Sequence, residues 1–211
     1  MSDELTFKQQ SGAEAVLDGS IQWGEEVGID PVLVHAITVP LAALRLGEQT
    51  ADDAPLLRLN SIRFGVASWR QLGGQSFSFP NVVRQIEADG ESHPVYDIYG
   101  SLRMGSEYHQ VVMTRIAFGP YDGCSVAVSM EGSVRSVSQP ALFNQIDFAC
   151  DASLTVGAVV VRGDLGSATP PTLAEADELT QRLLRLEDYR PPRSQNGRAV
   201  LEPLCPDSGR R

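Results

Sequence analysis

Short runs in which apolar and polar residues alternate recur along the first 164 residues, and they predict β-strands. The run 31–40 is rich in β-branched residues and bounded by prolines, and residues 56–69 alternate through Ile62, Phe64 and Val66. Residues 146–164 contain the continuous apolar run TVGAVVV, which is typical of a central strand. Crossover helices between these runs are missing, so the pattern favours antiparallel neighbours over βαβ units. Residues 41–47 are predicted as a short helical turn that stops at Gly47.

The clearest unit is an antiparallel meander of three strands, predicted over 95–104, 108–118 and 124–130. The connections between these strands are GSE and PYDG, and the second has the residue types that a tight turn requires. A turn at Gly105–Ser106 predicts a register in which Leu102 faces His109 and Phe118 faces His93.

The pattern changes after residue 171 to helical spacing. Thr172 and Glu175 form a capping box, and apolar residues recur on one face: Leu173, Ala176, Leu179, Leu183 and Leu186. We therefore expect one β-rich domain over 1–188 that ends in an amphipathic helix at 172–188. The Arg- and Pro-rich segment 189–211 is predicted as a mobile tail, in which AVLEPL could pack down.

Together these patterns predict a mainly β protein, either an antiparallel β-sandwich or a strongly curved sheet, with one C-terminal amphipathic helix. Apolar residues make up 42% of the chain and charged residues 21%, which is ordinary for a folded globular domain.

The net charge of −10 disfavours binding to nucleic acids and to anionic membranes. It suits a basic protein partner or a cation, although an acidic surface also serves solubility. The N-terminus lacks the features of a signal peptide, and no apolar run approaches the ~20 residues of a membrane span. Three cysteines without a CxxC motif predict free thiols in a reducing cytoplasm. A single lysine against sixteen arginines suggests a GC-rich bacterial genome.

The stretch HPVYDIYGSLRMGSEYHQ contains His93 and His109, with Asp97 and Glu107 between them, and raises the question of a metal site. In the predicted hairpin the two histidines lie about eight residues apart, which at ~3.3 Å per residue is on the order of 26 Å. Zinc ligands must meet within ~2.0–2.3 Å of one point. We therefore expect neither a metal site nor a cofactor here.

His93, Asp122 and Cys124 are the weak catalytic candidates, because the predicted meander brings them to one end. His93 and Cys124 would still lie two strands apart, roughly 10 Å, whereas a thiol nucleophile needs its base within ~3 Å. The sequence lacks a GxSxG elbow, a P-loop, a dinucleotide fingerprint and HExxH. His35, in an apolar strand, is expected to be a core or edge residue whose polar atoms are satisfied.

Four of the five tyrosines fall in or beside the meander: Tyr96, Tyr99, Tyr108 and Tyr121. With Asp97 they predict a binding surface, because tyrosine is favoured at interfaces, although it is also a good strand residue. The leading hypothesis is a non-catalytic cytoplasmic interaction protein with an immunity-type or assembly role. The alternative is a small-molecule binding protein or a hydrolase, with a carboxylate/His93 site in the sheet concavity.

Overall fold

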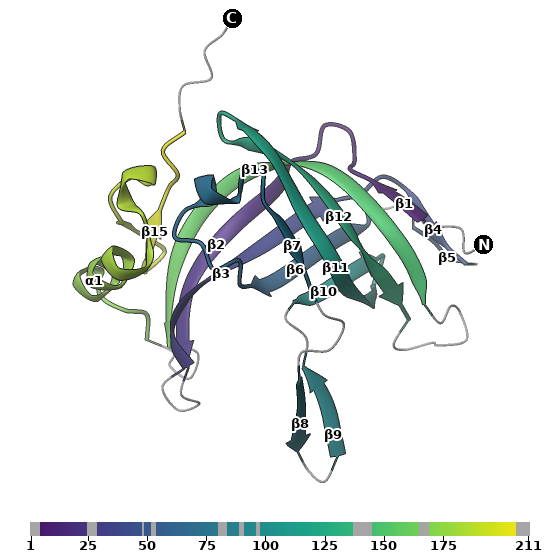
Figure 1. Cartoon of the computed structure of the whole chain (residues 1–211), viewed down its shortest axis with the longest axis horizontal. Coiled ribbons are helices and arrows are strands. Elements are labelled where there is room, and N and C mark those ends of the chain that lie inside the picture. The colour runs from purple at the N-terminus through teal and green to yellow at the C-terminus, as the bar shows by residue number, and fades with distance from the viewer. Residues whose placement is uncertain are drawn as a thin grey trace, which may run out of the picture.

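One large sheet bends so far that it closes on itself. Strand β12 (Ser125–Arg135) pairs on one side with β11 (Glu107–Asp122) and on the other with β13 (Ile146–Asp164). From β11 the sheet continues through β10 (Tyr99–Met104), β6 (Leu56–Ile62), β3 (Ile29–Pro40) and β2 (Ala15–Gly24) back to β13. Of the two predicted architectures, the strongly curved sheet is the one that forms (Figure 1).

The structure is a computed structural model, and it describes residues 5–24, 29–47, 49–51, 54–79, 84–88, 91–95, 98–136, 145–164 and 169–205. The remaining strands are β1 (Leu5–Lys8), β4 (Leu44–Leu46), β5 (Gln49–Ala51), β7 (Ser76–Ser78), β8 (Arg84–Ala88), β9 (Glu91–Val95), β14 (Arg193–Gln195) and β15 (Arg198–Leu201). The helical elements are α1 (Leu173–Leu183) and the 3-10 turns η1 (Trp69–Leu72) and η2 (Leu186–Asp188). No helix among these described residues is long and apolar enough to cross a membrane.

Strand β13 holds the closure together because it is long enough to pair with different neighbours at its two ends. Residues 146–155 pair with β12, and residues 154–164 pair with β2. The pairings of β13 with β1 and β2 are parallel, and the remaining pairings of the ring are antiparallel. A parallel pair needs a long connection, and here the chain between β2 and β13 runs through the whole ring in place of a crossover helix.

The meander is confirmed, and its register at the first turn is the predicted one, since Leu102 pairs with His109. The predicted partner of Phe118 was wrong: Phe118 pairs with Val128, and His93 pairs with Ile86 in a separate hairpin, β8–β9. This hairpin projects away from the large sheet (Figure 1). The predicted strand 95–104 therefore begins only at Tyr99, and Val95 belongs to β9.

The helical turn predicted at 41–47 was also wrong, because β4 lies there and pairs with β5. Leu46 is fully buried and Leu44 packs partly buried against the core, so the segment follows the two-residue period of a strand. Gly47 has φ +59 and makes the turn into β5.

The core fills the inner face of the ring in two clusters. Leu17, Ile37 and Leu59 belong to the larger cluster, whereas Ile21 and Leu33, further along the same face of β2 and β3, belong to the smaller one. Helix α1 covers the smaller cluster with Ala176, Leu179 and Leu183. The capping box of Thr172 and Glu175 is confirmed, but Leu173 is 48% exposed and the helix ends at Leu183 rather than at residue 188.

The segment predicted as a mobile tail contributes two strands to the large sheet. Strand β15 pairs with β13, and β14 pairs with β15 across a turn at Asn196 and Gly197. Ala199 and Leu201 are buried in the smaller core cluster, and this burial fixes the segment on the sheet. Asn-Gly is the strongest short hairpin signal, and both residues have the positive φ that a type I′ turn requires.

Candidate functional site

Three β-bulges border one cleft on the face of the sheet that turns away from the core. Two of these bulges interrupt the pairing of β13 with β2, and one interrupts the pairing of β3 with β6. A bulge re-aims the side chains beside it and is often found next to binding sites. We call this cleft the outer cleft.

The first bulge places Asp18. Residues 157 and 158 of β13 together oppose Asp18, because Val156 pairs with Leu17 and Val159 pairs with Gly19. The carboxylate of Asp18 lies directly over Gly157, where any Cβ atom would collide with Oδ1. A side chain at this position would therefore force the Asp18 carboxylate to move.

The second bulge turns residue 61 out of the strand. Between the pairs His35–Ile62 and Ile37–Leu59, two residues of β6 oppose Ala36 alone. Ser61 adopts φ +58, a conformation that is uncommon for a residue other than glycine. Backbone strain of this kind tends to be retained where function requires it.

The third bulge contains Arg162 itself, between the pairs Val161–Ile21 and Gly163–Gln22. Gly163 has φ +90, and the side chain of Arg162 is exposed at the border of the cleft. The cleft encloses about 80 Å³. Its side chains come from four neighbouring strands: Asp18, Ser20 and Gln22 of β2, Val34 and Ala36 of β3, Asn60 and Ser61 of β6, and Arg162 of β13.

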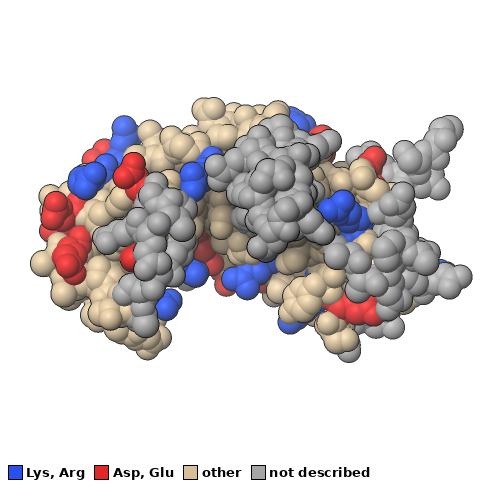
Figure 2. All heavy atoms as spheres, turned by 90° about the horizontal axis from the view of Figure 1, so that it is seen from below, with Lys and Arg blue, Asp and Glu red and all other residues tan. Residues whose placement is uncertain are grey.

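The electrostatics of the cleft centre on Asp18. Burial raises the pKa of this carboxyl above its usual range, although the guanidinium groups of Arg162 and Arg58 oppose that shift. Asp18 and Arg162 have no hydrogen-bond or ion-pair partner among the residues that the structure describes. Arg58 instead donates from Nε to Oδ1 of Asn60 at 3.1 Å. In Figure 2 acidic and basic side chains meet in the hollowed middle part of one face of the molecule.

His35 lies behind the cleft, on the inner face of β3. It is 4% exposed, and its ring centroid is 5.2 Å from that of Phe64. A hydrogen bond with the backbone of Ile62 uses one ring nitrogen, and Nδ1 has no partner. Burial lowers the pKa of His35 to about 4, so the ring is neutral at pH 7. Of the two expected positions, core or edge, His35 takes the core, but its ring is only partly satisfied because Nδ1 has no partner.

The catalytic candidates are not brought together. Cys124 forms a disulfide with Cys205, with the two Cα atoms 5.2 Å apart, so it is no free thiol nucleophile. Asp122 is exposed at the end of β11, and His93 lies in the separate β8–β9 hairpin. The prediction of three free thiols was wrong, and the cysteines therefore give no support to a reducing compartment. Burial raises the pKa of the remaining thiol, Cys150, to about 12.

Of the predicted tyrosine surface, the structure describes the side chains of Tyr108 and Tyr121 only, and these two lie far apart. Tyr108 is 62% exposed at one end of β11, whereas Tyr121, thirteen residues later, lies on the order of 40 Å away at ~3.3 Å per residue. Tyr121 donates to the backbone oxygen of Trp69 at 2.5 Å and packs against its ring, so it is an interior contact. Tyr96 and Asp97 lie outside the described residues, as does the side chain of Tyr99.

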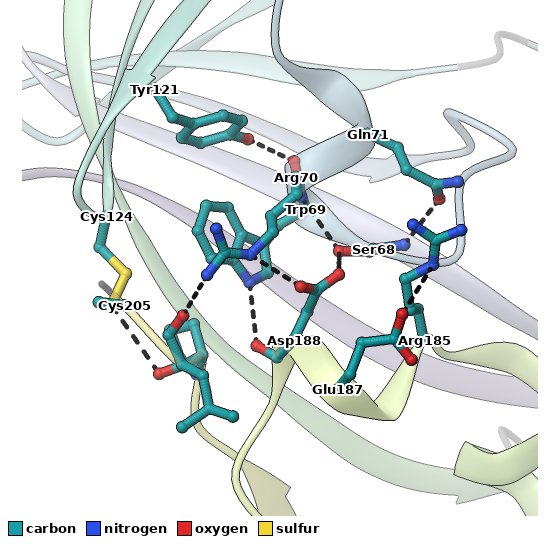
Figure 3. Close-up of polar contacts among 12 residues, drawn as sticks. Ser68, Trp69, Arg70, Gln71, Tyr121, Cys124, Arg185, Glu187, Asp188 and Cys205 are labelled. Carbon is teal, nitrogen blue, oxygen red and sulfur yellow. Dashed lines mark hydrogen bonds and ion pairs between the residues drawn. A yellow bond between two sulfur atoms is a disulfide. The ribbon is translucent and has the colours of Figure 1, made fainter.

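A second polar cluster fastens the C-terminal segment to the ring, and we call it the C-terminal clamp (Figure 3). The carboxylate of Asp188 accepts from Ser68 Oγ at 2.5 Å and pairs with Arg70 Nε at 2.7 Å. Arg70 also donates to the backbone oxygen of Leu204 at 2.7 Å and lies over the ring of Trp69. The Cys124–Cys205 disulfide completes the clamp. Because the polar groups of the clamp bind one another, we interpret the clamp as a feature that stabilises the fold.

The residues of the outer cleft were missed by sequence reasoning. Asp18, Ser61 and Arg162 lie in different strands, and no local motif joins them. Glycines beside a polar residue within the strand runs, as in DGS and RGD, are the one signal that could have indicated bulges. No group of histidine, cysteine or carboxylate side chains suited to a metal ion occurs within the described ranges.

Comparison with known proteins adds no identity: no family model matches the chain, and no curated protein or solved structure gives a significant match.

Proposed function

We propose that this chain is a non-catalytic interaction protein that binds a protein partner on the outer face of the sheet, with the outer cleft as the socket for one side chain of the partner. The observation that carries the proposal is the convergence of three bulges on one cleft, in which Asp18 and Arg162 have no hydrogen-bond or ion-pair partner among the described residues. Both side chains are exposed, so their charges are available to a partner of complementary charge and shape.

The size of the cleft favours a side chain over a metabolite. Its volume is about 80 Å³, whereas sites for small molecules typically enclose ~300–1,000 Å³. One amino-acid side chain fits such a space, and the rest of the contact would then lie on the surface around it.

The alternative of a small-molecule binding protein or hydrolase has less support. Nucleophilic catalysis needs a nucleophile within hydrogen-bond reach of a base, but His93 lies in the separate β8–β9 hairpin and Cys124, in the turn between β11 and β12, forms a disulfide. The net charge of −10 supports attraction of a basic partner over a distance. An immunity-type or assembly role remains part of the proposal.

The test is affinity capture of the partner from the source organism with a variant whose socket is filled. Ala36 lies on the floor of the cleft, so Ala36→Gln would place a larger polar side chain there. Ala127→Gln is the matched control, because Ala127 is exposed on β12, away from the cleft. Captured proteins are identified by mass spectrometry, and both variants are first checked for the melting temperature of the wild type.

We expect wild type and Ala127→Gln to retain the same protein, and Ala36→Gln to lose it by about tenfold or more in affinity. Equal capture by all three would show that the outer cleft is not the binding site. Absence of any captured protein, together with a bound small molecule in the native mass spectrum, would favour the alternative.

A further inference from the structure

Two strands lie end to end along one edge of β13. Strand β12 pairs with residues 146–155 of β13 and β15 pairs with residues 159–161, while β2 occupies the opposite edge along 154–164. Both β12 and β15 are antiparallel to β13, so they run in the same direction, and the end of β15 points toward the start of β12. The disulfide joins them where they meet, because Cys124 immediately precedes β12 and Cys205 follows β15 (Figure 3).

This disulfide is accessible from solvent on one side. Cys205 is exposed, whereas Cys124 is half-buried. A thiolate breaks a disulfide by attacking one of its sulfur atoms, and exposed disulfides are more labile than buried ones. The third cysteine, Cys150, is buried and takes no part in the bridge. A thiol reductant can therefore reach the bridge at Cys205.

The closure of the ring does not depend on the bridge. It is made by the ladder between β12 and β13, which continues without a register shift over residues 125–134 of β12, and by the parallel pairing of β13 with β2. Neither Cys124 nor Cys205 belongs to these ladders. Reduction of the bridge should therefore leave the ring closed.

The hairpin of β14 and β15 is held by fewer contacts. Strand β15 pairs with three residues of β13, Val159–Val161, and the residues of β14 at the end of the sheet are all exposed. Beyond β15, Leu204 donates its amide to the backbone oxygen of Asp188 at 2.8 Å and accepts from Arg70 at 2.7 Å. A short ladder at the end of a sheet opens at a lower free energy than the closed part of the sheet.

We propose that the Cys124–Cys205 disulfide is a redox latch, whose reduction releases the hairpin of β14 and β15 from β13 while the ring stays closed. The bridge holds the end of β15 against the start of β12 and so keeps the short ladder in register. Release leaves one edge of Val159–Val161 unpaired, and an unpaired edge can accept another strand. The latch does not depend on binding at the outer cleft.

The reaction is a two-electron exchange with a dithiol. One thiolate of the dithiol attacks Sγ of Cys205, a mixed disulfide forms, and Sγ of Cys124 leaves as a thiolate that takes up a proton. The second thiol of the dithiol then attacks the mixed disulfide and displaces Cys205, which is protonated in turn. The protein bridge is reduced to two thiols, and the dithiol is oxidised to its cyclic disulfide.

The experiment compares NMR spectra of the isotope-labelled full chain before and after reduction with dithiothreitol. Mass spectrometry first establishes the bridge in the oxidised chain. We expect the NOEs between β15 and β13 to disappear on reduction, with the released hairpin making up at least about nine-tenths of the chains. The amide resonances of Arg190 and Leu204, which donate to backbone oxygens in the docked state, should move to random-coil positions. The NOEs between β12 and β13 should persist.

Two cysteine variants are the controls. Cys205→Ser cannot form the bridge, so its hairpin should be released before any reductant is added. Cys150→Ala keeps the bridge and should respond to dithiothreitol as the wild type does.

A hairpin that stays docked in the reduced wild type and in Cys205→Ser would overturn the proposal, because the ladder and the clamp would then hold it without the bridge. Loss of the NOEs between β12 and β13 on reduction would also overturn it, since the bridge would then support the whole ring. A mass without the bridge in the oxidised chain would reject the latch at the outset.

Discussion

Two aspartates that lie in polar clusters of the same chain have opposite surroundings. Asp188, in the C-terminal clamp, is 7% exposed, and its carboxylate binds Ser68 and Arg70. Asp18, in the outer cleft, is more exposed and has no hydrogen-bond or ion-pair partner among the described residues. Both carboxylates have arginines near them, so residue type alone does not separate the two sites.

The difference shows how to distinguish a structural polar cluster from a candidate binding site. A buried carboxylate whose bonds are made inside the chain stabilises the fold and has little left to offer a ligand. An exposed carboxylate without a hydrogen bond or ion pair inside the chain keeps its hydrogen-bonding capacity for a partner. Perturbations of the clamp should therefore change stability, and perturbations of the cleft should change binding.

The largest expected effect on the clamp comes from its disulfide. Cys124→Ser with Cys205→Ser should lower the free energy of unfolding by about 4 kcal/mol, because the bridge joins residues 81 positions apart and restricts the unfolded chain. Urea unfolding of the variant and of the wild type, with and without a reducing agent, measures this. A wild type that is insensitive to the reducing agent would show that the bridge contributes nothing to stability.

Removal of the clamp carboxylate should have the next largest effect. Asp188→Ala leaves Arg70 and Ser68 without their acceptor and should cost about 3 kcal/mol. The matched cleft variant, Asp18→Asn, should change the free energy of unfolding by less than about 0.5 kcal/mol, because it breaks no hydrogen bond or ion pair within the described residues and removes a charge whose burial is unfavourable. Similar losses in the two variants would abolish the distinction between clamp and cleft.

Acidification should lower the free energy of unfolding through His35, which lies behind the cleft. The pKa of this histidine is about 4 in the folded chain and 6.5 when exposed, so below pH 6.5 the unfolded chain takes up the proton first. Stability from this group is fully present above pH 6.5 and falls as the pH approaches 4, by about 2 kcal/mol between pH 7 and pH 5. Urea unfolding across this range should show a slope that His35→Leu flattens, and an equal slope in the variant would assign the effect to other groups.

The smallest expected effect on stability distinguishes variants of the two described tyrosine side chains of β11. Tyr121→Phe removes the hydrogen bond to the backbone oxygen of Trp69 and should cost about 1 kcal/mol. Tyr108→Phe, at an exposed position, should leave stability unchanged. Thermal unfolding of both variants distinguishes them, and a reversed order would mean that Tyr121 is not part of the interior.

Local features of the fold were predictable because their causes are local. The register of Leu102 with His109 follows from a two-residue turn, and the helix start follows from Thr172 and Glu175. The Asn196–Gly197 turn carried an equally strong signal, but the surrounding prolines and arginines led to the prediction of a mobile tail. In the structure, the burial of Ala199 and Leu201 against β13 fixes this segment on the sheet.

The sequence by itself determined the long strand runs of the ring, the meander and the start of the amphipathic helix, because alternation, turn residues and capping pairs act within a few residues of one another. Only the tertiary structure decided that β12 and β13 close the ring, that Cys124 meets Cys205, and that Asp18, Ser61 and Arg162 share a cleft. These contacts join residues far apart in the chain, and the shared cleft depends on bulges that shift the register by one residue. Such a shift follows from the packing of the whole sheet, which no short stretch of sequence specifies.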